Sequence, residues 1–480
     1  MIVLLINMKN IDLASLTIEN AHKAMINGDF SATDLVKAYM KIISEKNKEI
    51  NAYLEVYDDV LEQARKADEI IKSGKGNLLT GIPFAIKDNI LIKGRKATSA
   101  SKILADYHAT YDATVIKKLR EAGAIFLGRT NMDEFAMGGS TENSAFGVTR
   151  NPYDTSRVAG GSSGGSAASV AMDGALVALG SDTGGSIRQP ASFCGLVGLK
   201  PTYGAVSRYG VMAMGSSLDQ IGPLGKTVKD VEIIFDTIKG KDIHDGTTIS
   251  IDTYRSERIG KNKPILGIPK HFLNGDGIDK NVLDNFNKTI EIFKEKGYEI
   301  KDIKLPNIAY SLAVYYVIMP AEASSNLARF DGVKYGLHKD GENIIDDYFE
   351  TRGEGFGKEV RRRVLLGTYV LSSGYYDAYY NRANALRRVI TEDFHKAFEN
   401  VDIVLTPTTP APAFKIGEKS SDPVAMYLED IFTVTANLTG MPAMTIPSGF
   451  ADKLPLGVQI TARHGDERTL FEVGKDLLGE

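Results

Sequence analysis

The chain has 480 residues, of which 43% are hydrophobic and 25% are charged, ordinary values for a globular protein. Its 57 basic and 61 acidic side chains give a net charge of −4, so no strong basic field indicates nucleic-acid binding by this chain. The one cysteine, Cys194, excludes an internal disulfide and a multi-cysteine metal site, and is typical of a reducing cytoplasm.

The chain begins with an apolar run, residues 1–6, which is far too short to span a bilayer. It lacks the charged start and the small-residue cleavage site of a signal peptide. Because Met8 follows at once, we expect either Met1 or Met8 to be the start of a cytoplasmic protein. No other apolar run is long enough for a transmembrane helix.

Residues 11–75 have a helical pattern throughout. Thr17 and Ser31 are expected to begin helices, and Asp34 stands in the capping-box position relative to Ser31. The glycines in 74–76 end the pattern. We predict that residues 1–75 form an N-terminal helical arm packed on one main domain, residues 76–480.

The main domain alternates strand and helix patterns, which predicts an α/β fold with a mixed sheet. A stretch that is mostly helical, about 310–400, interrupts this alternation before the last part of the chain. No fixed-period repeat and no low-complexity linker divides it, so one large domain is predicted. The predicted strands are 81–89, which ends in polar residues, 124–128, 176–180, 264–269 and 401–407, and the clearest predicted helices are 113–123 and 282–296.

Two clusters of glycine and serine, residues 160–166 and 182–190, are the most unusual feature of the sequence. Fixing a glycine costs conformational entropy, so a dense block needs a geometric reason, such as special dihedrals or close approach to a ligand. The residues between the clusters are small, apolar and compatible with a helix. The combination favours a binding or catalytic site over a flexible linker.

Two familiar kinds of site fit this block poorly. A phosphate-binding P-loop needs a lysine after its last glycine, and this block has none. The Gly-x-Ser-x-Gly pattern of a hydrolase elbow occurs around Ser162 and Ser163, but it arises easily in so glycine-rich a segment. None of the seven histidines lies in or near the block, so a histidine triad would need a remote histidine.

A serine nucleophile without histidine needs another base, and lysine is the usual substitute. An ordinary lysine, with a pKa of about 10.4, is protonated at neutral pH, so burial is needed to make it a base. Lys87 follows the apolar run 82–86, and strand alternation directs it away from its acidic neighbour Asp88. The alternative is a solvated lysine at the end of a strand.

The motifs around Lys87, Ser162 and Ser186 resemble the Ser–cisSer–Lys triad of the amidase signature family. The matching segments are Gly-Ile-Pro-Phe-Ala-Ile-Lys-Asp-Asn, Gly-Gly-Ser-Ser-Gly-Gly-Ser and Asp-Thr-Gly-Gly-Ser-Ile-Arg, and the similarity continues over 193–204 and 457–459. The resemblance therefore covers most of the chain. It implies the amidase-signature fold, a central mixed, twisted sheet covered by helices on both faces.

The resemblance also implies a role for each motif residue. Ser186 is the expected nucleophile, and Ser162, whose family counterpart sits on a cis peptide, relays a proton from Ser186 to a neutral Lys87. The expected oxyanion hole consists of backbone N–H groups, those of Thr183, Gly184, Gly185 and Ser186. No metal is expected in this mechanism.

Three further stretches, 129–138, 322–332 and 427–433, resemble the A subunits of the glutamyl-tRNA(Gln) and aspartyl-tRNA(Asn) amidotransferases. This resemblance implies hydrolysis of glutamine and delivery of ammonia for amidation of a misacylated tRNA. The expected partners are a B subunit that holds the tRNA, ATP and Mg²⁺, and a small C subunit, in a heterotrimer. No cofactor is expected in this chain.

By the same resemblance, glutamine's α-amino and α-carboxylate groups are held by Asp430, one arginine of 361–363, and Tyr315 or Tyr316. We favour Arg363 and Tyr315, since a bidentate contact to the carboxylate explains the arginine. The other arginines of the run then belong to a solvated helix face.

The sequence departs from the family pattern at three positions, and Gly139, which replaces a usual Ser, lies nearest the expected substrate pocket. The other two departures are Ala205 and Gly215. Cys194 is expected to be a buried structural residue, because no histidine lies near it. Two other functions stay open: a stand-alone amidase for other small or aryl amides, and a scaffold without catalytic activity.

Overall fold

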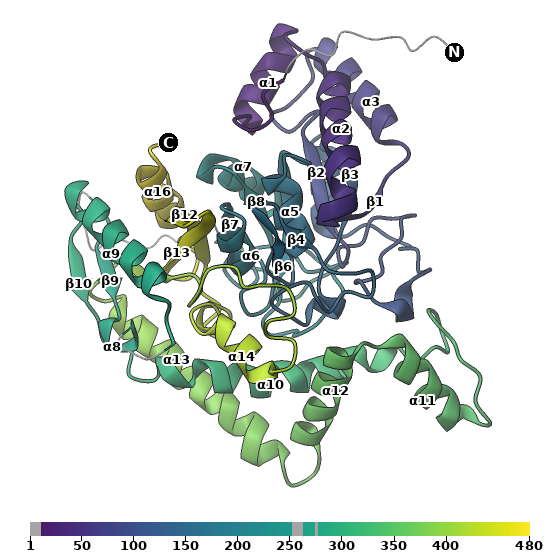
Figure 1. The fold of residues 1–480 in the computed structure, drawn as a ribbon, viewed down its shortest axis with the longest axis vertical. Helices are drawn as coiled ribbons and strands as arrows, with labels where there is room; N and C mark the ends of the chain where they lie inside the picture. Colours follow the sequence, from purple (N-terminus) through teal and green to yellow (C-terminus); the bar gives the residue numbers. More distant parts are fainter. Residues whose placement is uncertain (1–10, 252–262, 274–276) are drawn as a thin grey trace.

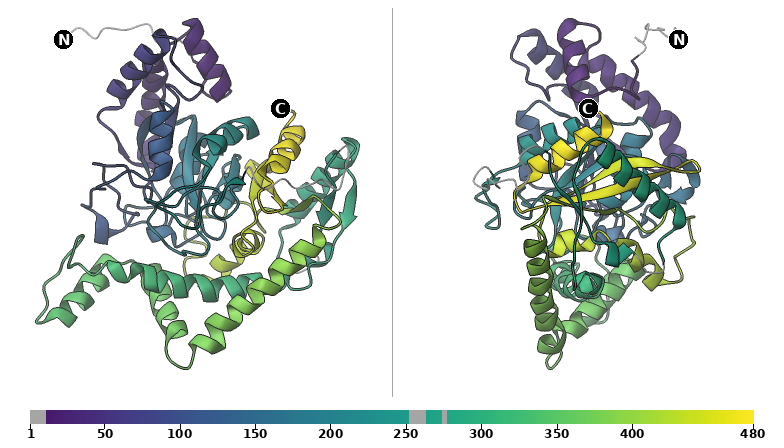
Figure 2. Two further views of the ribbon diagram at one scale, coloured as in Figure 1. Left: turned by 180° about the vertical axis from the view of Figure 1, so that it is seen from behind. Right: turned by 90° about the vertical axis from the view of Figure 1, so that its left-hand side faces the viewer.

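The computed structural model describes residues 11–251, 263–273 and 277–480, so the expected start at Met1 or Met8 lies outside the described residues. Figure 1 shows a twisted sheet at the centre of the molecule, with the first three helices at one end. A layer of long helices runs along the opposite side, and the two further views in Figure 2 agree. The predicted α/β class is confirmed.

Within the described residues, eleven strands form one mixed sheet in the order β1-β3-β2-β6-β8-β7-β12-β13-β11-β9-β10, and β4 and β5 form a separate pair. β2 lies between β3 and β6 and runs parallel to both, so the carboxyl ends of these strands share one edge. The strands are β1 Tyr53–Val56, β2 Pro83–Lys87, β3 Ile125–Thr130, β4 Arg150–Asn151, β5 Asp154–Val158, β6 Val177–Asp182, β7 Val197–Lys200, β8 Gln220–Gly225, β9 Leu266–Ile268, β10 Ile300–Asp302, β11 Ile403–Pro407, β12 Ala443–Ala451 and β13 Leu454–Ala462.

Helices cover both faces of the sheet, as two glycines of β8 show. A Cβ on Gly222 would meet Ile187, just before α6, whereas a Cβ on Gly225 would meet Val231 in α7. Because residues three apart on a strand point to opposite faces, α6 and α7 lie on opposite sides. The helices are α1 Ile18–Asn27, α2 Ala32–Ile50, α3 Val60–Lys72, α4 Thr114–Glu121, α5 Gly164–Ala171, α6 Arg188–Phe193, α7 Val228–Ile238, α8 Lys270–Leu273, α9 Lys280–Glu295, α10 Ser311–Asn326, α11 Ile344–Gly355, α12 Lys358–Leu371, α13 Arg382–Ala397, α14 Pro423–Tyr427, α15 Val434–Leu438 and α16 Glu467–Leu478.

The predicted strands are confirmed as β2, β3, β6, β9 and β11, and the predicted helices as α4 and α9. The segment of about 310–400 is mostly helical, since α10 to α13 occupy it. The helical prediction for residues 11–75 is wrong over β1, which pairs antiparallel with β3 at the edge of the sheet. The division into residues 1–75 and 76–480 stays a prediction.

The predicted capping box begins α2. The Ser31 hydroxyl accepts the N–H of Asp34 at 3.0 Å, and the Asp34 carboxylate accepts the N–H of Ser31 at 3.0 Å. These two bonds satisfy donors that the first turn of a helix leaves open.

In the part of the chain that the structure describes, no helix combines the length and the apolar character needed to cross a membrane.

Helices α10 and α12 pack against each other at very short range. Gly367 of α12 lies against the carbonyl of Pro320 in α10, where an added Cβ would come within 1.8 Å of the oxygen. Any side chain at position 367 would therefore force the two helices apart. This close contact fixes the relative position of two helices whose side chains face the site described next.

Candidate active site

The candidate site lies at the sheet edge where the parallel strands β2 and β6 end. Lys87 is the last residue of β2, and Ser181 and Asp182 end β6. The segment that precedes α5 carries Ser162 and Ser163 to the same edge. Polar residues far apart in the sequence therefore meet because neighbouring parallel strands end together.

The Lys87 side chain is fully buried among hydroxyl groups. Its Nζ lies 2.7 Å from Ser162 Oγ, 2.8 Å from Ser163 Oγ and 2.9 Å from Ser181 Oγ. It also lies 3.2 Å from the Ser181 carbonyl oxygen. The sequence-based alternative of a solvated lysine at a strand end is therefore wrong.

Burial lowers the pKa of the Lys87 ammonium from its ordinary value to about 7, although the carboxylates of Asp133 and Asp182 act in the opposite direction. An ammonium group has three N–H donors and no acceptor, whereas the neutral amine has a lone pair. At a pH above 7 the amine can therefore accept the proton of the Ser162 hydroxyl. Lys87 therefore has the burial and the lowered pKa that a lysine base at neutral pH requires, and its catalytic role stays a prediction.

The peptide bond between Gly161 and Ser162 is cis, in agreement with the family resemblance. The Gly161 N–H donates to Gln189 Oε1 at 2.9 Å, and Thr141 Oγ1 donates to the Gly160 carbonyl at 2.7 Å. A Cβ on Gly161 would lie 2.1 Å from Asp133 Oδ2, so no larger residue fits there. Close packing thus explains the glycines that precede Ser162.

Ser186 lies on the turn between β6 and α6, and its neighbour Ile187 anchors this turn to the sheet. A Cβ at position 180, 198 or 222, on three adjacent strands, would come within 3.0–3.1 Å of the Ile187 side chain. Glycine at all three positions opens the space that Ile187 fills. The turn is therefore seated directly on the sheet, which fixes the height of Ser186 above it.

A buried ion pair braces the same turn from within. Asp182 Oδ1 lies 2.9 Å from Arg188 Nη2, and both side chains are fully buried. Asp182 also accepts the backbone N–H groups of Gly185, at 2.9 Å, and Ile187, at 3.1 Å. Although burial alone would raise the pKa of the Asp182 carboxyl, the Arg188 guanidinium holds it at about 2. The charged pair persists at every physiological pH.

The Ser186 hydroxyl has no hydrogen-bond partner among the described residues, and the side chain is nearly buried. The backbone connects it to the rest of the site, because the Ser163 N–H donates to the Ser186 carbonyl at 3.1 Å. The structure brings Lys87 and Ser162 into contact and places the turn of Ser186 beside them. The direct contact from Ser162 to Ser186, which the relay requires, is not formed within the described residues.

The proposed oxyanion donors divide into two groups. The N–H of Gly185 is already bonded to Asp182, whereas those of Thr183, Gly184 and Ser186 have no partner among the described residues. Gly184 also packs against a substrate-binding candidate, since a Cβ there would lie 2.6 Å from the Tyr315 ring. The donors left open lie at the turn that carries Ser186, where a carbonyl under attack would sit.

The three candidates for binding glutamine belong to one cluster, in which Tyr315 and Arg363 are buried and Asp430 is half-buried. Arg363 is 4% exposed, and its Nε donates to Glu359 Oε1 at 2.7 Å. The arginine lies over the rings of Tyr316 and Tyr427, at 5.5 and 5.4 Å from their centroids. Asp430 accepts the hydroxyl of Tyr316 at 2.9 Å.

Burial raises the pKa of the Asp430 carboxyl to about 7. A cationic group bound beside it would favour the carboxylate, so this residue suits an α-ammonium group. Of the two tyrosines, Tyr316 bonds to Asp430 and Tyr315 lies against Gly184. Their rings meet edge to face with centroids 5.0 Å apart, so together they join the Asp430 cluster to the Ser186 turn.

Cys194 is fully buried, as predicted, and burial raises the pKa of its thiol. Its Sγ bonds to the Ala159 carbonyl.

Gly139 has space beside it, since an added Cβ would lie 3.6 Å from Gln189 Nε2. Its carbonyl accepts a hydrogen bond from that amide at 2.7 Å, so the departure at 139 stays connected to the Gly161 segment.

Sequence reasoning missed several members of the site. Ser163 and Ser181 share Lys87 with Ser162, and Asp182 and Arg188 brace the nucleophile turn. Ser163, Asp182 and Arg188 lie inside the quoted motifs and Ser181 directly precedes one, so their position was a signal, but their contacts depend on strand pairing. Glu359 and Tyr427 hold Arg363 and each other; Tyr427 begins the stretch 427–433, whereas Glu359 lies outside every quoted motif and gave no signal.

Comparisons with known proteins agree with this geometry. The family model described as Amidase matches residues 34–471. The A subunit of glutamyl-tRNA(Gln) amidotransferase from Thermoanaerobacter pseudethanolicus is 52% identical over 470 residues, 96% of each chain. The protein of the same name from Carboxydothermus hydrogenoformans is 53% identical over 452 residues, 93% of each chain.

Solved structures give the same picture. The A subunit of glutamyl-tRNA(Gln) amidotransferase from Thermotoga maritima superposes with a TM-score of 0.81 at 41% identity, covering 98% of this chain and 95% of that one. The native peptide amidase from Stenotrophomonas maltophilia superposes with a TM-score of 0.80 at 26% identity, over 98% and 97% of the two chains. The likeness therefore extends over nearly the whole fold.

Proposed function

This chain belongs to the amidase family, with the amidase signature fold, and on that premise we propose that it is the glutamine-hydrolysing A subunit of a tRNA-dependent amidotransferase. Its product, ammonia, converts Glu-tRNA(Gln) to Gln-tRNA(Gln). The observation that carries the proposal is the buried Lys87 beside the turn of Ser186. Its Nζ lies 2.7 Å from Ser162 Oγ, and burial lowers its pKa to about 7. The similar proteins that carry the amidotransferase name support the choice of glutamine over other amides.

Hydrolysis begins when Ser186 Oγ attacks the carboxamide carbon of glutamine. Its proton passes to Ser162 Oγ, and the Ser162 proton passes to the neutral Lys87 Nζ. The carbonyl oxygen becomes an oxyanion, for which the open N–H groups of the 183–186 turn are the donors, each worth about 3–4 kcal/mol. The substrate must draw the Ser186 hydroxyl toward Ser162 for this relay to form.

The tetrahedral intermediate collapses when the carbon–nitrogen bond breaks. Lys87 returns its proton through Ser162 to the departing nitrogen, which leaves as ammonia, and Ser186 keeps the glutamyl group as an ester. Water then attacks this ester with Lys87 again acting as base. The products are glutamate, ammonia and the free Ser186 hydroxyl, so Lys87 is restored in its neutral form.

The Asp430 cluster positions the substrate for this attack. Asp430 binds the α-ammonium group, and Arg363 binds the α-carboxylate with the guanidinium nitrogens that do not bond to Glu359. Tyr315 packs between this cluster and Gly184, so it holds the side chain of glutamine toward Ser186. An amide without both α-groups loses these contacts and binds weakly.

Amidation of the tRNA lies outside this chain. The carboxylate of a misacylated tRNA must be activated before ammonia can displace a leaving group, and ATP with Mg²⁺ in a B subunit supplies that activation. A net charge of −4 fits a chain that leaves most of the tRNA contact to the B subunit. A small C subunit completes the heterotrimer.

The proposed function predicts ammonia release from glutamine that increases when the partner subunits and misacylated tRNA are added. The measurement is ammonia production by the purified chain, alone and with B and C subunits, against a panel of simple aliphatic and aryl amides. Preference for glutamine with stimulation by the partners supports the proposal. Better turnover of an aryl amide, with no response to the partners, would identify a stand-alone amidase instead.

The role of Arg363 predicts an effect on substrate binding. Arg363→Lys should raise the KM for glutamine about 10- to 100-fold, the loss of one charge-assisted hydrogen bond, with a smaller change in kcat. Arg362→Lys is the matched control, because Arg362 is 36% exposed and should change KM less than about threefold. The measurement is the KM for glutamine of both variants by steady-state kinetics. Equal changes in KM would mean that Arg363 does not bind the substrate.

A further inference from the structure

The peptide group between Gly184 and Gly185, directly before Ser186, is held at both ends by side chains. Its N–H, that of Gly185, donates to Asp182 Oδ1 at 2.9 Å. Its carbonyl, that of Gly184, accepts the hydroxyl of Thr433 at 2.6 Å. Because the N–H and the carbonyl of a trans peptide point in opposite directions, these two bonds clamp the group from opposite sides.

Glycine on both sides leaves this peptide group few restraints of its own. Gly185 has a φ of 138°, in the region that favours glycine, and a Cβ there would lie 2.3 Å from Thr433 Oγ1. A Cβ on Gly184 would lie 2.6 Å from the Tyr315 ring. The close approach of Thr433 therefore requires glycine, and the flexible segment that glycine creates needs the two side-chain bonds to fix its orientation.

The Thr433 hydroxyl has one proton and two acceptors within reach. The Gly184 carbonyl lies at 2.6 Å and the Asp430 carbonyl at 3.1 Å. The Asp430 carbonyl already accepts the Thr433 N–H at 3.0 Å, so the hydroxyl is left to donate to the nearer Gly184 carbonyl. Both Thr433 and Gly184 are buried, so removing the hydroxyl takes a partner from a carbonyl that bulk water does not reach.

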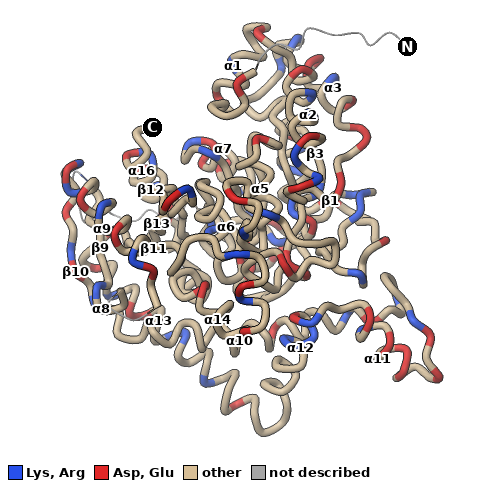
Figure 3. Tube along the Cα trace, viewed as in Figure 1, with Lys and Arg blue, Asp and Glu red and all other residues tan. Residues whose placement is uncertain are grey.

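The other end of the clamp is a buried charge. Acidic and basic residues are distributed along the whole trace in Figure 3, and Asp182 and Arg188 belong to the minority whose side chains are fully buried. Arg188 Nη1 also donates to the Thr433 carbonyl at 2.9 Å. The ion pair and Thr433 therefore form one connected network around the peptide group, and a buried network with its partners in place is rigid.

The clamped group lies between the two peptide groups that carry open oxyanion donors. The N–H of Gly184 belongs to the peptide group before it and the N–H of Ser186 to the one after it, and neither has a partner among the described residues. Fixing the middle group restrains the direction of both neighbours, since each is joined to it through a single residue. Donors that are aimed before the reaction stabilise an oxyanion without reorganisation during the attack.

We propose that Thr433 is a positioning residue for the oxyanion hole. Its hydroxyl holds the 184–185 peptide group so that the N–H groups of Gly184 and Ser186 face the carbonyl oxygen under attack. The inference rests on the proposed function, which supplies the amide and the attack by Ser186. Because the Thr433 N–H bonds to the carbonyl of Asp430, the same residue also joins the oxyanion turn to the segment that binds the α-ammonium group.

The experiment replaces Thr433 with valine, which keeps the branched shape and lacks the hydroxyl. The kcat for glutamine should fall about 10- to 100-fold, because misaimed donors stabilise only the transition state less, while KM changes less than about threefold. Thr433→Ser keeps the hydroxyl and should restore kcat to within about threefold of the wild type. Thr433→Ala removes the hydroxyl without placing a methyl group beside the Gly184 carbonyl, so it tests the same loss of kcat with less crowding.

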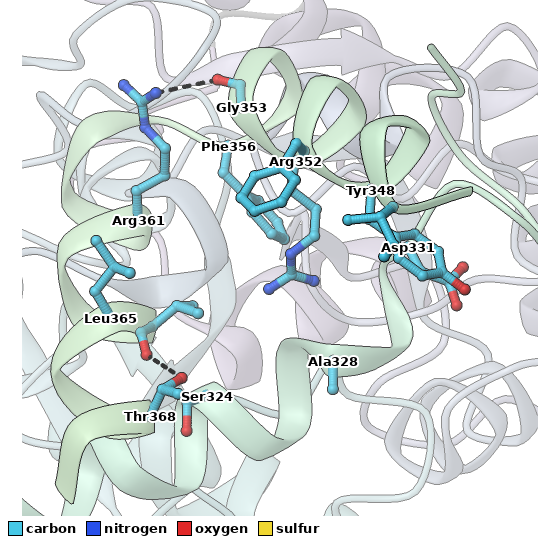
Figure 4. A pocket seen from close by; sticks show the side chains of 13 residues that line it. Ser324, Ala328, Asp331, Tyr348, Arg352, Gly353, Phe356, Arg361, Leu365 and Thr368 are labelled. Carbon is cyan, nitrogen blue, oxygen red and sulfur yellow. Dashed lines mark hydrogen bonds between the residues drawn. The ribbon is translucent and has the colours of Figure 1, made fainter. Parts of the chain in front are cut away.

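Two control variants make the same change elsewhere. Thr435 is 3% exposed and its Oγ1 has no partner among the described residues, so Thr435→Val should keep kcat within about threefold of the wild type. Thr368 lines a groove of about 720 Å³ between α11 and α12, and its hydroxyl donates to the Val364 carbonyl at 2.8 Å (Figure 4). Thr368→Val loses this hydroxyl–carbonyl bond away from the turn and should also keep kcat.

Each outcome decides between the claims. If the wild type hydrolyses glutamine and Thr433→Val loses no more kcat than Thr435→Val, the clamp is wrong while the proposed function stands. If Thr433→Val raises KM with kcat unchanged, or Thr433→Ser does not restore kcat, Thr433 acts through substrate binding or packing, and the proposal is overturned. If the wild type hydrolyses a simple amide but not glutamine, the proposed function fails, and the kcat of the same variants with that amide decides on the clamp. If it hydrolyses no amide, both fail.

Discussion

Replacing Ser186 with alanine is expected to reduce glutamine hydrolysis by at least about 10⁴-fold, because the nucleophile's oxygen is lost and no covalent intermediate can form. The fold should be unaffected. The Ser186 hydroxyl has no hydrogen-bond partner among the described residues, so its removal leaves no buried group unsatisfied. The measurements are ammonia release from glutamine and a denaturant unfolding curve of the same preparation.

A matched control separates the loss of the nucleophile from the loss of any buried hydroxyl nearby. Ser192 lies on α6, is 1% exposed, and its Oγ has no partner among the described residues. Ser192→Ala should keep activity within about threefold of the wild type. Mass spectrometry of acid-quenched wild-type protein should detect a glutamyl ester on Ser186. Turnover by Ser186→Ala above about 1% would contradict the assignment of the nucleophile.

Local sequence patterns were enough to predict the strands that form the site edge. The apolar run before Lys87 becomes the buried strand β2, and the alternation of strand and helix gives the mixed sheet. Such elements need no information from distant residues, because an apolar run of this length next to turn residues already favours a strand. The cis peptide and the triad followed from the family resemblance instead.

The strand β1 could not be predicted in the same way. Its four residues, Tyr53 to Val56, lie between two helices, and only Tyr53 is fully buried. What makes it a strand is antiparallel pairing with β3, whose residues lie more than 70 positions later. A pairing over such a distance leaves no periodic signal in a segment of this length.

The substrate cluster shows a second limit of the sequence. The sequence cannot distinguish the three consecutive arginines 361–363. Their positions on the helix do, because only Arg363 turns inward, against Glu359 and two tyrosines. The sequence also could not show that Tyr315 and Tyr316 both belong to the cluster. The structure gives the two residues different contacts, one with Gly184 and the other with Asp430.

Replacing Lys87 with methionine is expected to lower kcat/KM for glutamine about 10²- to 10⁴-fold, the usual contribution of a general base. In the wild type, kcat/KM should rise about tenfold per pH unit below pH 7 and level off above it, because burial places the pKa of Lys87 at about 7 and only the amine is active. The methionine variant should show no such rise of kcat/KM around pH 7. Its residual rate should rise only at alkaline pH, where hydroxide replaces the base.

Although Lys87→Met should lower activity, it should not lower the free energy of unfolding. The unfolded chain keeps the Lys87 proton up to about pH 10.4, whereas the folded chain releases it near pH 7. Between these values the unfolded state binds more protons, so the free energy of unfolding rises with pH, and below pH 7 the full cost of burying the ammonium is present. Lys87→Met removes that cost, so the variant should be at least as stable as the wild type at pH 6, and its stability should depend less on pH between 7 and 10. A variant that is inactive and also clearly less stable at pH 6 would mean that Lys87 supports the fold rather than the chemistry.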